Sequence, residues 1–241
     1  MRLFLYLHKA TILFIYERIV AFLYIFYQQE VNVMQIKEEV LFDIQNRWFG
    51  EHRAKVSVYQ NDEGRTITVL DWRKPGTGVF SVRYILDGYY LHVTGDCGYA
   101  LYHLTEKAEL RKLAHYDMMY LHEKNVCIAE NGIVYDPEEA VSTIQEYISG
   151  VEGDVEWSED DKDIINDTIE EAQGAITSEG WHQRLAVLDY RYNLDNVFSD
   201  WAEWLYDCGD CYSHQAVAFW LGLRMAYAQI VEQEKEKNHD Q

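Results

Sequence analysis

The amino-acid sequence predicts an α+β protein: an antiparallel β-meander of about four strands packed with helices, followed by an acidic all-helical region. Three observations support this prediction. Residues 79–104 alternate with a period of two, as β-strands do. Apolar residues recur at three- and four-residue spacing near residue 40 and in the last third of the chain. Acidic side chains concentrate after residue 153.

Residues 79–104, VFSVRYILDGYYLHVTGDCGYALYHL, form the clearest pattern. Two runs, 81–86 and 89–94, alternate in polarity and are rich in β-branched and aromatic residues, which is typical of strands. Between them lies Asp87-Gly88, and both residue types tolerate the positive φ that a type I′ turn needs at its two central positions. The sequence therefore predicts a β-hairpin closed by Asp87-Gly88.

A second turn, Gly95-Asp96-Cys97-Gly98, precedes another apolar run over residues 99–104. The two glycines predict a tight turn or a bulge that redirects the chain. Asp96 has two interpretations. It either presents a carboxylate at a strand end for chemistry or metal binding, or accepts hydrogen bonds from the amides of the turn. The second role is the more common one for Asp in turns.

Residues 1–33 are apolar and aromatic, but charged residues interrupt them, so no run reaches the roughly 18–20 residues that span a bilayer. No small-residue cleavage site of a signal peptide is evident. Residues 29–31 can be encoded by a purine-rich bacterial ribosome-binding sequence a short distance before the Met34 codon. We therefore interpret residues 1–33 as a translated leader outside the fold, with a membrane anchor as the alternative.

Residues 34–152 are expected to form the α+β domain. The pattern predicts a helix from Met34 to Phe49, strands over 55–60 and 66–72, the hairpin, a helix from Thr105, a short strand near 127–129 and a helix over 137–149. Asp136 is a typical N-cap, and Pro137 fits the first turn. Gly150 and Gly153 mark a domain boundary.

Residues 153–241 are expected to be wholly helical. Ser158 and Asp161 match a capping box at the start of the first helix. Further helices are expected over residues 195–207 and from Ser213 to about residue 232. Opposite the apolar face of the first helix runs a stripe of acidic residues that repeats with each helical turn, namely Asp160, Asp163, Asp167, Glu170 and Glu171.

The formal net charge of −20 is uneven: +1 over residues 1–33, −7 over 34–152 and −14 over 153–241. A field of this sign repels nucleic acid and attracts basic partners, so we expect no direct DNA or RNA binding. The four cysteines are too few and too scattered for a disulfide framework. A reducing cytoplasm is the simplest interpretation.

The motif Cys208-Gly-Asp-Cys211-Tyr-Ser-His214 contains three residues of the types that bind zinc. The sequence holds no second C-x2-C to complete a common zinc site. A redox role would need a lowered thiol pKa, which Asp207 and Asp210 oppose because like charge disfavours a thiolate. We favour plain reduced cysteines between two helices and expect no cofactor, with a structural zinc site as the alternative.

An enzymatic interpretation has little support from motifs. The sequence contains no P-loop, H-E-x-x-H, G-x-S-x-G or dinucleotide fingerprint. The nearest candidates are three carboxylates beside the predicted meander, Asp62, Asp71 and Asp96, which resemble the acids of metal-dependent hydrolases or nucleases. Their spacing is loose, and the net charge opposes a nucleic-acid substrate. Surface turn charges are the simpler interpretation.

A binding function uses the features that stand out in the last third of the chain. Trp201 and Trp204 lie among many acids and few bases. Aromatic anchors with surrounding acids suit a basic partner surface, because aromatics supply binding energy and acids steer the encounter. The acidic stripe could also imitate a phosphate backbone. The alternative is that the tryptophans are helix core and the acids a solvated face.

Two segments, FSVRYILDGYYLHVTGDCGYALYHLT and YSHQAVAFWLGLRMAYAQI, resemble parts of small proteins carried by phages and mobile elements of Gram-positive bacteria. The resemblance covers residues 35–147 and the last helix, and its motifs are core and turn patterns without a catalytic residue. It implies a phage accessory protein of the class that inhibits host defence, such as the anti-CRISPR or Gabija anti-defence type. No motif of this chain matches either type.

These observations together lead to one expected function. We expect a phage-encoded, non-enzymatic inhibitor that acts in the host cytoplasm, without a membrane, and binds a host defence protein that handles nucleic acid. A homo-oligomer is compatible with the sequence. A metal-dependent hydrolase and a structural zinc protein remain as alternatives.

Overall fold

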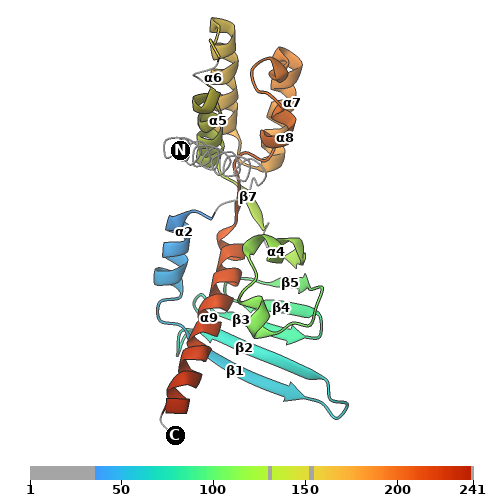
Figure 1. Cartoon of the computed structure of the whole chain (residues 1–241), viewed down its shortest axis with the longest axis vertical. Coiled ribbons are helices and arrows are strands. Elements are labelled where there is room, and N and C mark those ends of the chain that lie inside the picture. Colours follow the sequence, from blue (N-terminus) through green and yellow to red (C-terminus); the bar gives the residue numbers. More distant parts are fainter. Residues whose placement is uncertain (1–35, 130–131, 152–154, 240–241) are drawn as a thin grey trace, which may run out of the picture. The chain divides into compact units, whose positions relative to one another are not determined.

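The computed structural model describes residues 36–129, 132–151 and 155–239. These residues belong to one compact unit, residues 35–241 (Figure 1). The expected leader over residues 1–33 lies outside the described ranges. Within them the chain is a mixed α and β protein with an antiparallel sheet, as the sequence predicts.

The main sheet has six antiparallel strands in sequence order, whereas about four were expected. Two short strands extend the predicted meander, because the apolar run after the Gly95–Gly98 turn pairs with the hairpin and then with the segment near Cys127. The strands are β1 (Arg53–Gln60), β2 (Thr66–Arg73), β3 (Val82–Asp87), β4 (Tyr90–Gly95), β5 (Ala100–His103) and β6 (Asn125–Ile128).

The predicted hairpin is confirmed, but its turn lies one residue later than expected. Asp87 pairs with Tyr90, so the two-residue loop is Gly88-Tyr89. Gly88 has a φ of 61°, and Tyr89 is not among the described residues with positive φ. A single positive φ at the first central position is typical of a type II′ turn, whereas type I′ needs two. Glycine therefore takes the one position that demands it.

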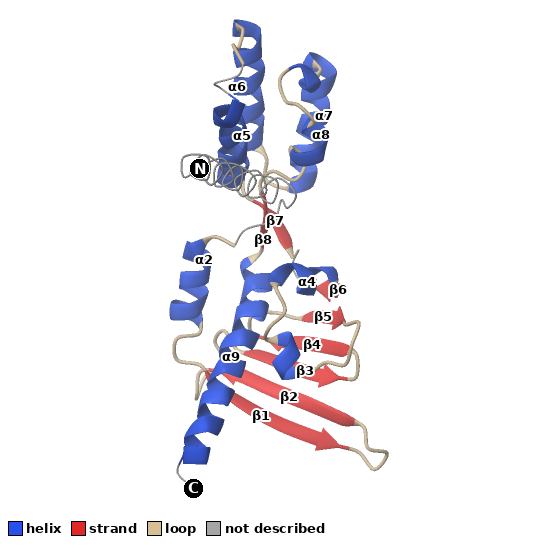
Figure 2. Ribbon diagram, in the orientation of Figure 1, coloured by secondary structure: helices blue, strands red, loops and turns tan. Residues whose placement is uncertain are grey.

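One face of the sheet is covered by α9 (His214–His239), which packs against β1, β2 and β3 (Figure 2). The side chains on this face alternate along the strands with exposed ones; Leu70, Tyr84 and Val93 are buried. The Tyr84 hydroxyl donates a hydrogen bond to the Phe219 carbonyl of α9 at 2.8 Å. The helix thus supplies the apolar layer that the inner face of the sheet requires.

Three shorter helical segments complete this part of the molecule. The predicted N-terminal helix is confirmed as α2 (Glu38–Asp43) and a π-helical turn, Ile44–Trp48. The helix expected from Thr105 is wrong: α3 (Leu110–Leu113) and α4 (Met118–Glu123) begin later and are short. Residues 36–129 and 213–239 share the sheet and the helices around it, and we call them the sheet domain.

The remaining part of the chain begins with one strand of a two-stranded ribbon and ends with the other. β7 (Ile133–Tyr135) pairs antiparallel with β8 (Asp210–Tyr212), so that Tyr135 lies opposite Asp210. Between these strands run α5 (Pro137–Val151), α6 (Glu159–Gly174), α7 (Ser178–Tyr192), a 3-10 turn (Leu194–Asn196) and α8 (Trp201–Trp204). We call residues 136–209 the helical module. The region after residue 153 is therefore not wholly helical, because it contains β8.

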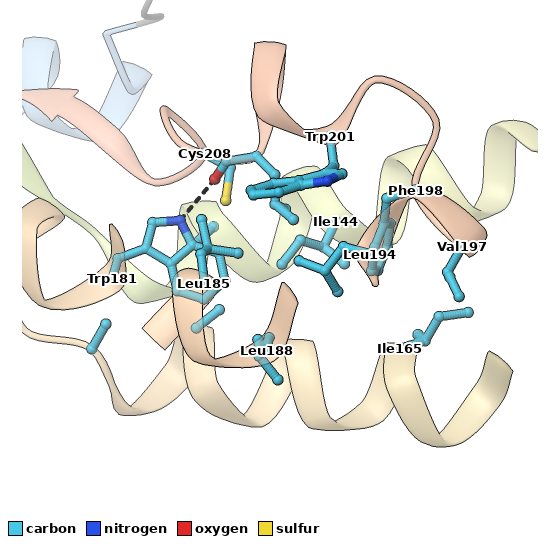
Figure 3. Packing of buried hydrophobic residues seen from close by; sticks show 14 of the residues in the cluster. Ile144, Ile165, Trp181, Leu185, Leu188, Leu194, Val197, Phe198, Trp201 and Cys208 are labelled. Atoms are coloured by element: carbon cyan, nitrogen blue, oxygen red, sulfur yellow. Dashed lines mark hydrogen bonds between the residues drawn. The ribbon is translucent and has the colours of Figure 1, made fainter. Parts of the chain in front are cut away.

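The helical module has its own apolar core (Figure 3). Trp181 is fully buried, and its indole N–H donates to the Leu205 carbonyl at 2.7 Å. Leu185, Leu188 and Phe198 are buried around it. Ile144 and Ala140 of α5 belong to the same cluster. The boundary expected after residue 152 therefore separates α5 from helices with which it shares a core.

Two predicted helix starts in the module are confirmed and one predicted helix is wrong. Asp136 accepts hydrogen bonds from the Glu138 and Glu139 amides at the start of α5. Ser158 and Asp161 form the expected capping box of α6. The helix expected over residues 195–207 is interrupted because Asp200, with a φ of 50°, precedes α8. A left-handed residue cannot continue a right-handed helix.

His52 is buried in the core between the sheet and the helices. It is 2% exposed, and its Nε2 lies 3.1 Å from the Phe80 carbonyl oxygen. Its ring packs edge-on against Phe49, with 5.0 Å between ring centroids. Burial lowers the pKa of His52 below its ordinary value; the Phe80 contact opposes this, Lys74 adds to the lowering, and Glu51 counteracts Lys74. The folded chain therefore holds His52 neutral.

Stability should decline in mild acid because of His52. Its pKa is lower in the folded than in the unfolded state, so the unfolded chain binds more protons below about pH 6.5. We expect the free energy of unfolding to fall as the pH drops through this value, by at most about 1.4 kcal/mol per pH unit. Urea unfolding of His52→Gln should show a flatter pH dependence than wild type. The exposed His103→Gln serves as control, and equal slopes in all three proteins would contradict the prediction.

Candidate binding surfaces

The helical module carries most of the charge of the molecule. Residues 136–209 contain 20 acidic and three basic side chains, which gives a formal net charge of −17 out of the −20 of the whole chain. The sequence-based division at residue 153 assigned −14 to the acidic region, because it placed α5 in the other domain. The β7–β8 ribbon therefore separates a strongly acidic module from a nearly neutral sheet domain.

The predicted acidic stripe lies on α6 and divides into two groups. Asp160, Asp163 and Glu170 are exposed and make no ion pair or hydrogen bond among the described residues. Asp163 and Glu170 project away from the apolar face that carries Ile164 and Ile165, and Asp160 lies in the first turn at the edge of that face. These three carboxylates, which we call the α6 acidic face, are available to a partner.

The other two acids of the stripe contact α7. The Asp167 carboxylate accepts a hydrogen bond from the Tyr192 hydroxyl and lies 3.6 Å from the Arg191 guanidinium. The Glu171 carboxylate forms an ion pair with Arg184. Because these contacts join α6 to α7, a substitution of Asp167 or Glu171 would alter the packing of the module as well as its charge.

The structure does not place the two predicted tryptophan anchors on the surface. Trp201 is 8% exposed and belongs to the module core. Trp204 is half-buried; its ring stacks on Tyr147, with 4.7 Å between centroids, and its indole N–H donates to the Ser199 carbonyl at 3.2 Å. The core interpretation therefore applies to Trp201, while Trp204 packs partly buried against the same core.

The exposed aromatic side chain of the module is Tyr190, one of several aromatic residues among the acids but not one of the two chosen as anchors from the sequence. Tyr190 is 94% exposed, and Val187, one turn earlier on α7, is 56% exposed. Trp181, Leu185 and Leu188 hold the opposite face of the helix in the core. The helical periodicity could have separated Tyr190 from the core residues, since Tyr190 points to the side of the helix roughly opposite Trp181 and Leu185.

The C-x2-C motif does not gather its three predicted ligands. Cys208 is buried in the module core, whereas His214 is exposed at the start of α9 and stacks on Trp48. Burial, with a smaller contribution from neighbouring carboxylates, raises the pKa of Cys208 to about 12 and that of Cys211 to about 11. Both thiols are therefore protonated at neutral pH and poor nucleophiles.

The three predicted carboxylates of a metal-dependent enzyme lie apart. Asp62 is in the β1–β2 loop, and Asp71 lies five residues beyond the start of β2, roughly 17 Å along the strand. The Asp71 carboxylate pairs with the Arg83 guanidinium at 2.7 Å. The Asp96 carboxylate accepts a hydrogen bond from the Phe80 amide at 2.8 Å, which belongs to the loop before β3 and not to the turn that contains Asp96. Among the described residues no three His, Cys, Asp or Glu side chains are grouped to hold a metal ion.

An open cleft of about 740 Å³ lies beside α2 and the start of α5. Lys37 and Asp136 line it, and their side chains pair at 2.7 Å. The hydrogen bond to Asp136 raises the pKa of Lys37. Arg47, also in the lining, pairs with Asp43 at 2.8 Å. Lys37 with Asp136 and Arg47 with Asp43 are thus engaged with one another, whereas Glu38 and Glu39, which also line the cleft, form no ion pair among the described residues.

The described part of the chain contains no helix whose length and apolar character would suffice for crossing a membrane. Comparison with protein-family models, curated proteins and solved structures finds no match for this chain. The most distinctive surface of the described molecule is the α6 acidic face within a module of net charge −17.

Proposed function

We propose that this chain is a phage-encoded, non-enzymatic inhibitor that binds a host defence protein through its acidic helical module. The partner is expected to present a basic surface of the kind that handles nucleic acid, and binding takes place in the host cytoplasm. The observation that carries the proposal is the net formal charge of −17 in the helical module, which the β7–β8 ribbon joins to the sheet domain. The resemblance of two segments to proteins of phages and mobile elements supports the biological setting.

The placement of the charges supports a binding role beyond solubility. A solubilising charge can be distributed over any surface, whereas here the sheet domain is nearly neutral and the module is not. Three carboxylates of the α6 acidic face have no partner within the described residues. Acids in this arrangement raise the association rate with a basic protein and repel nucleic acid from the same surface. Occupation of a nucleic-acid groove by such a helix would exclude the natural ligand.

Exposed Tyr190 completes the surface that the proposal requires. Charged contacts at the rim of an interface mainly steer the encounter, while buried aromatic side chains supply most of the binding energy. Tyr190 and Val187 lie on the exposed face of α7, next to α6 in the module. We assign them the anchor role that the sequence suggested for the two core tryptophans.

Reversal of the α6 acidic face should weaken partner binding without unfolding the module. We expect the triple variant Asp160→Lys, Asp163→Lys, Glu170→Lys to bind about 10- to 100-fold more weakly, mainly through a slower association rate. The partner is first isolated from bacterial host lysate after nuclease treatment, and the dissociation constant is then measured with purified proteins at several salt concentrations. Wild-type affinity should fall as salt rises, because exposed charges are screened.

A matched control changes the same number of charges elsewhere. Glu232, Glu234 and Glu236 are exposed on α9, and their replacement by Lys alters the net charge equally. This control should bind within a few-fold of wild type. Equal weakening by both triple variants would indicate a non-specific charge effect, and unchanged binding by the α6 variant would reject the acidic face. If a stoichiometric partner survives nuclease treatment but binds both triple variants with the affinity of wild type, the interface lies on another surface.

A further inference from the structure

The outer edge of the first strand of the main sheet has no neighbouring strand among the described residues, and Gln229 of α9 contacts this edge at Ala54. β1 is the outermost strand and pairs with β2 alone among the described strands (Figure 2). Val56, Val58 and Tyr59 are 37%, 63% and 61% exposed, which places three large apolar side chains within four residues. Long apolar edges of this kind present unpaired backbone groups and act as templates for another strand.

The hydrogen-bond pattern identifies which backbone groups face outward. The Asn61 N–H donates to the Arg65 carbonyl at 3.1 Å, and the β1–β2 register continues from there without a break. Because antiparallel residues alternate in their direction of pairing, the even-numbered residues of β1 face away from β2. Ala54 shows this directly, since its N–H donates to Gln229 Oε1 of α9 at 2.7 Å. Beyond Ala54, the outward N–H and C=O groups of β1 belong to Val56, Val58 and Gln60.

We propose that these groups pair with β1 of a second copy of this chain, antiparallel, across a two-fold axis at Val58. In this register Val58 lies opposite Val58 of the partner subunit, and Val56 lies opposite Gln60 of the partner subunit. The outward N–H and C=O groups of Val56, Val58 and Gln60 then gain partners, and the Ala54 N–H stays with α9. The two six-stranded sheets join into one continuous sheet of twice that width.

Charge complementarity selects a second copy as the occupant. β1 begins with Arg53 and Lys55, which pair with no carboxylate among the described residues. The loop that follows the strand contains Asp62 and Glu63, which are exposed and also form no ion pair there. In an antiparallel two-fold pairing, the basic start of each strand lies beside the acidic loop of the other. An isologous interface satisfies this complementarity twice.

Size measurement with a matched pair of substitutions tests the interface. The full chain should elute with a light-scattering mass near twice its 28.5 kDa, in a concentration-dependent manner. Val58→Lys places two ammonium groups opposite each other at the axis and should yield monomer. Val126→Lys, on the other edge strand β6 with a similar 59% exposure, should leave the dimer intact. A monomeric wild type at all concentrations, or equal masses for the two variants, would overturn the proposal.

A cross-linking pair tests the register without depending on the effect of a charge. At the axis, opposite residues of a hydrogen-bonded pair have Cα atoms about 5.5 Å apart, within the range of a disulfide. Val58→Cys should therefore give a covalent dimer under mild oxidation on a non-reducing gel. Val56→Cys, on the same strand and face, lies roughly four residues from its own copy and should not. Equal cross-linking of the two variants, or of wild type with its native cysteines, would reject this register.

Discussion

Trp181→Ala should unfold the helical module and cost about 3–5 kcal/mol in the free energy of unfolding. Trp181 is fully buried, and its ring lies at one end of the drawn core cluster, between α7 and the segment before β8 (Figure 3). The substitution leaves a large cavity and removes the hydrogen bond that the Leu205 carbonyl accepts from the Trp181 indole. A module of this size has little stability to lose, so the loss is expected to exceed what α5–α8 can tolerate.

Hydrogen exchange read separately for the two parts of the chain measures this effect. Amides of α6 and α7 should lose protection in Trp181→Ala, while those of β2–β4 retain it, because the sheet domain has its own core with α9. Tyr190→Ala is the control on the same helix, since Tyr190 is 94% exposed and its truncation should change stability by less than about 0.5 kcal/mol. Loss of protection in the sheet to the same extent would show that the two parts unfold as one.

Gly222→Ala should weaken the attachment of α9 to the sheet by about 1–3 kcal/mol. A Cβ at Gly222 would lie 2.7 Å from the Tyr84 hydroxyl oxygen and 3.0 Å from Phe49 Cε2. Tyr84 is fully buried, and its hydroxyl is held by the Phe219 carbonyl, so it cannot move aside freely. The overpacking should outweigh the gain in helix propensity that Ala normally brings over Gly.

A double-mutant cycle separates this clash from a general effect of the substitution. Tyr84→Phe removes the hydroxyl oxygen nearest to the new methyl group, so the two substitutions together should cost less than the sum of their separate effects. Phe49 remains close, and the rescue should therefore be partial. Gly150→Ala in α5, where a new Cβ meets nothing within 4 Å, should be neutral or stabilising. Additive effects in the cycle would contradict the proposed contact.

Local patterns predicted the meander but not the insertion of the helical module. The alternation over residues 81–94 and the caps at Asp136 and Ser158 depend on neighbouring residues, and the structure confirms them. β7 and β8 have three residues each, and their partners are more than 70 residues apart in the sequence. Such short strands carry too few residues for a period-two signal, and pairing at that separation leaves no local trace.

The helix expected over residues 195–207 was wrongly predicted for a different reason, namely the backbone conformation of two residues. The apolar spacing of Val197, Trp201 and Leu205 is helical, but Asn193 and Asp200 adopt positive φ. Asn and Asp adopt the left-handed conformation more readily than most residues, and two of them bound the irregular segment. Periodicity alone could not show that these three apolar side chains reach one core from a bent segment.

The candidate surface was partly predictable. Charge composition located the acidic region and the α6 face, because solvated charges need no tertiary partner to be exposed. The division of the stripe depended on α7, whose Arg184 and Tyr192 engage Glu171 and Asp167. The two tryptophans were misassigned, because large aromatic residues serve interfaces and cores alike and only packing decides between them.

The β7–β8 ribbon makes the module a removable cassette. Tyr135 and Asp210 are cross-strand neighbours, so the chain leaves and re-enters the sheet domain at adjacent points. Joining them through a two-residue turn would convert the ribbon into an ordinary hairpin and delete residues 136–209 without stretching the backbone. The same geometry allows the module to be exchanged for another of different surface. A lineage built on this scaffold can therefore change the charge of its surface by replacing one insert while it keeps the sheet unchanged.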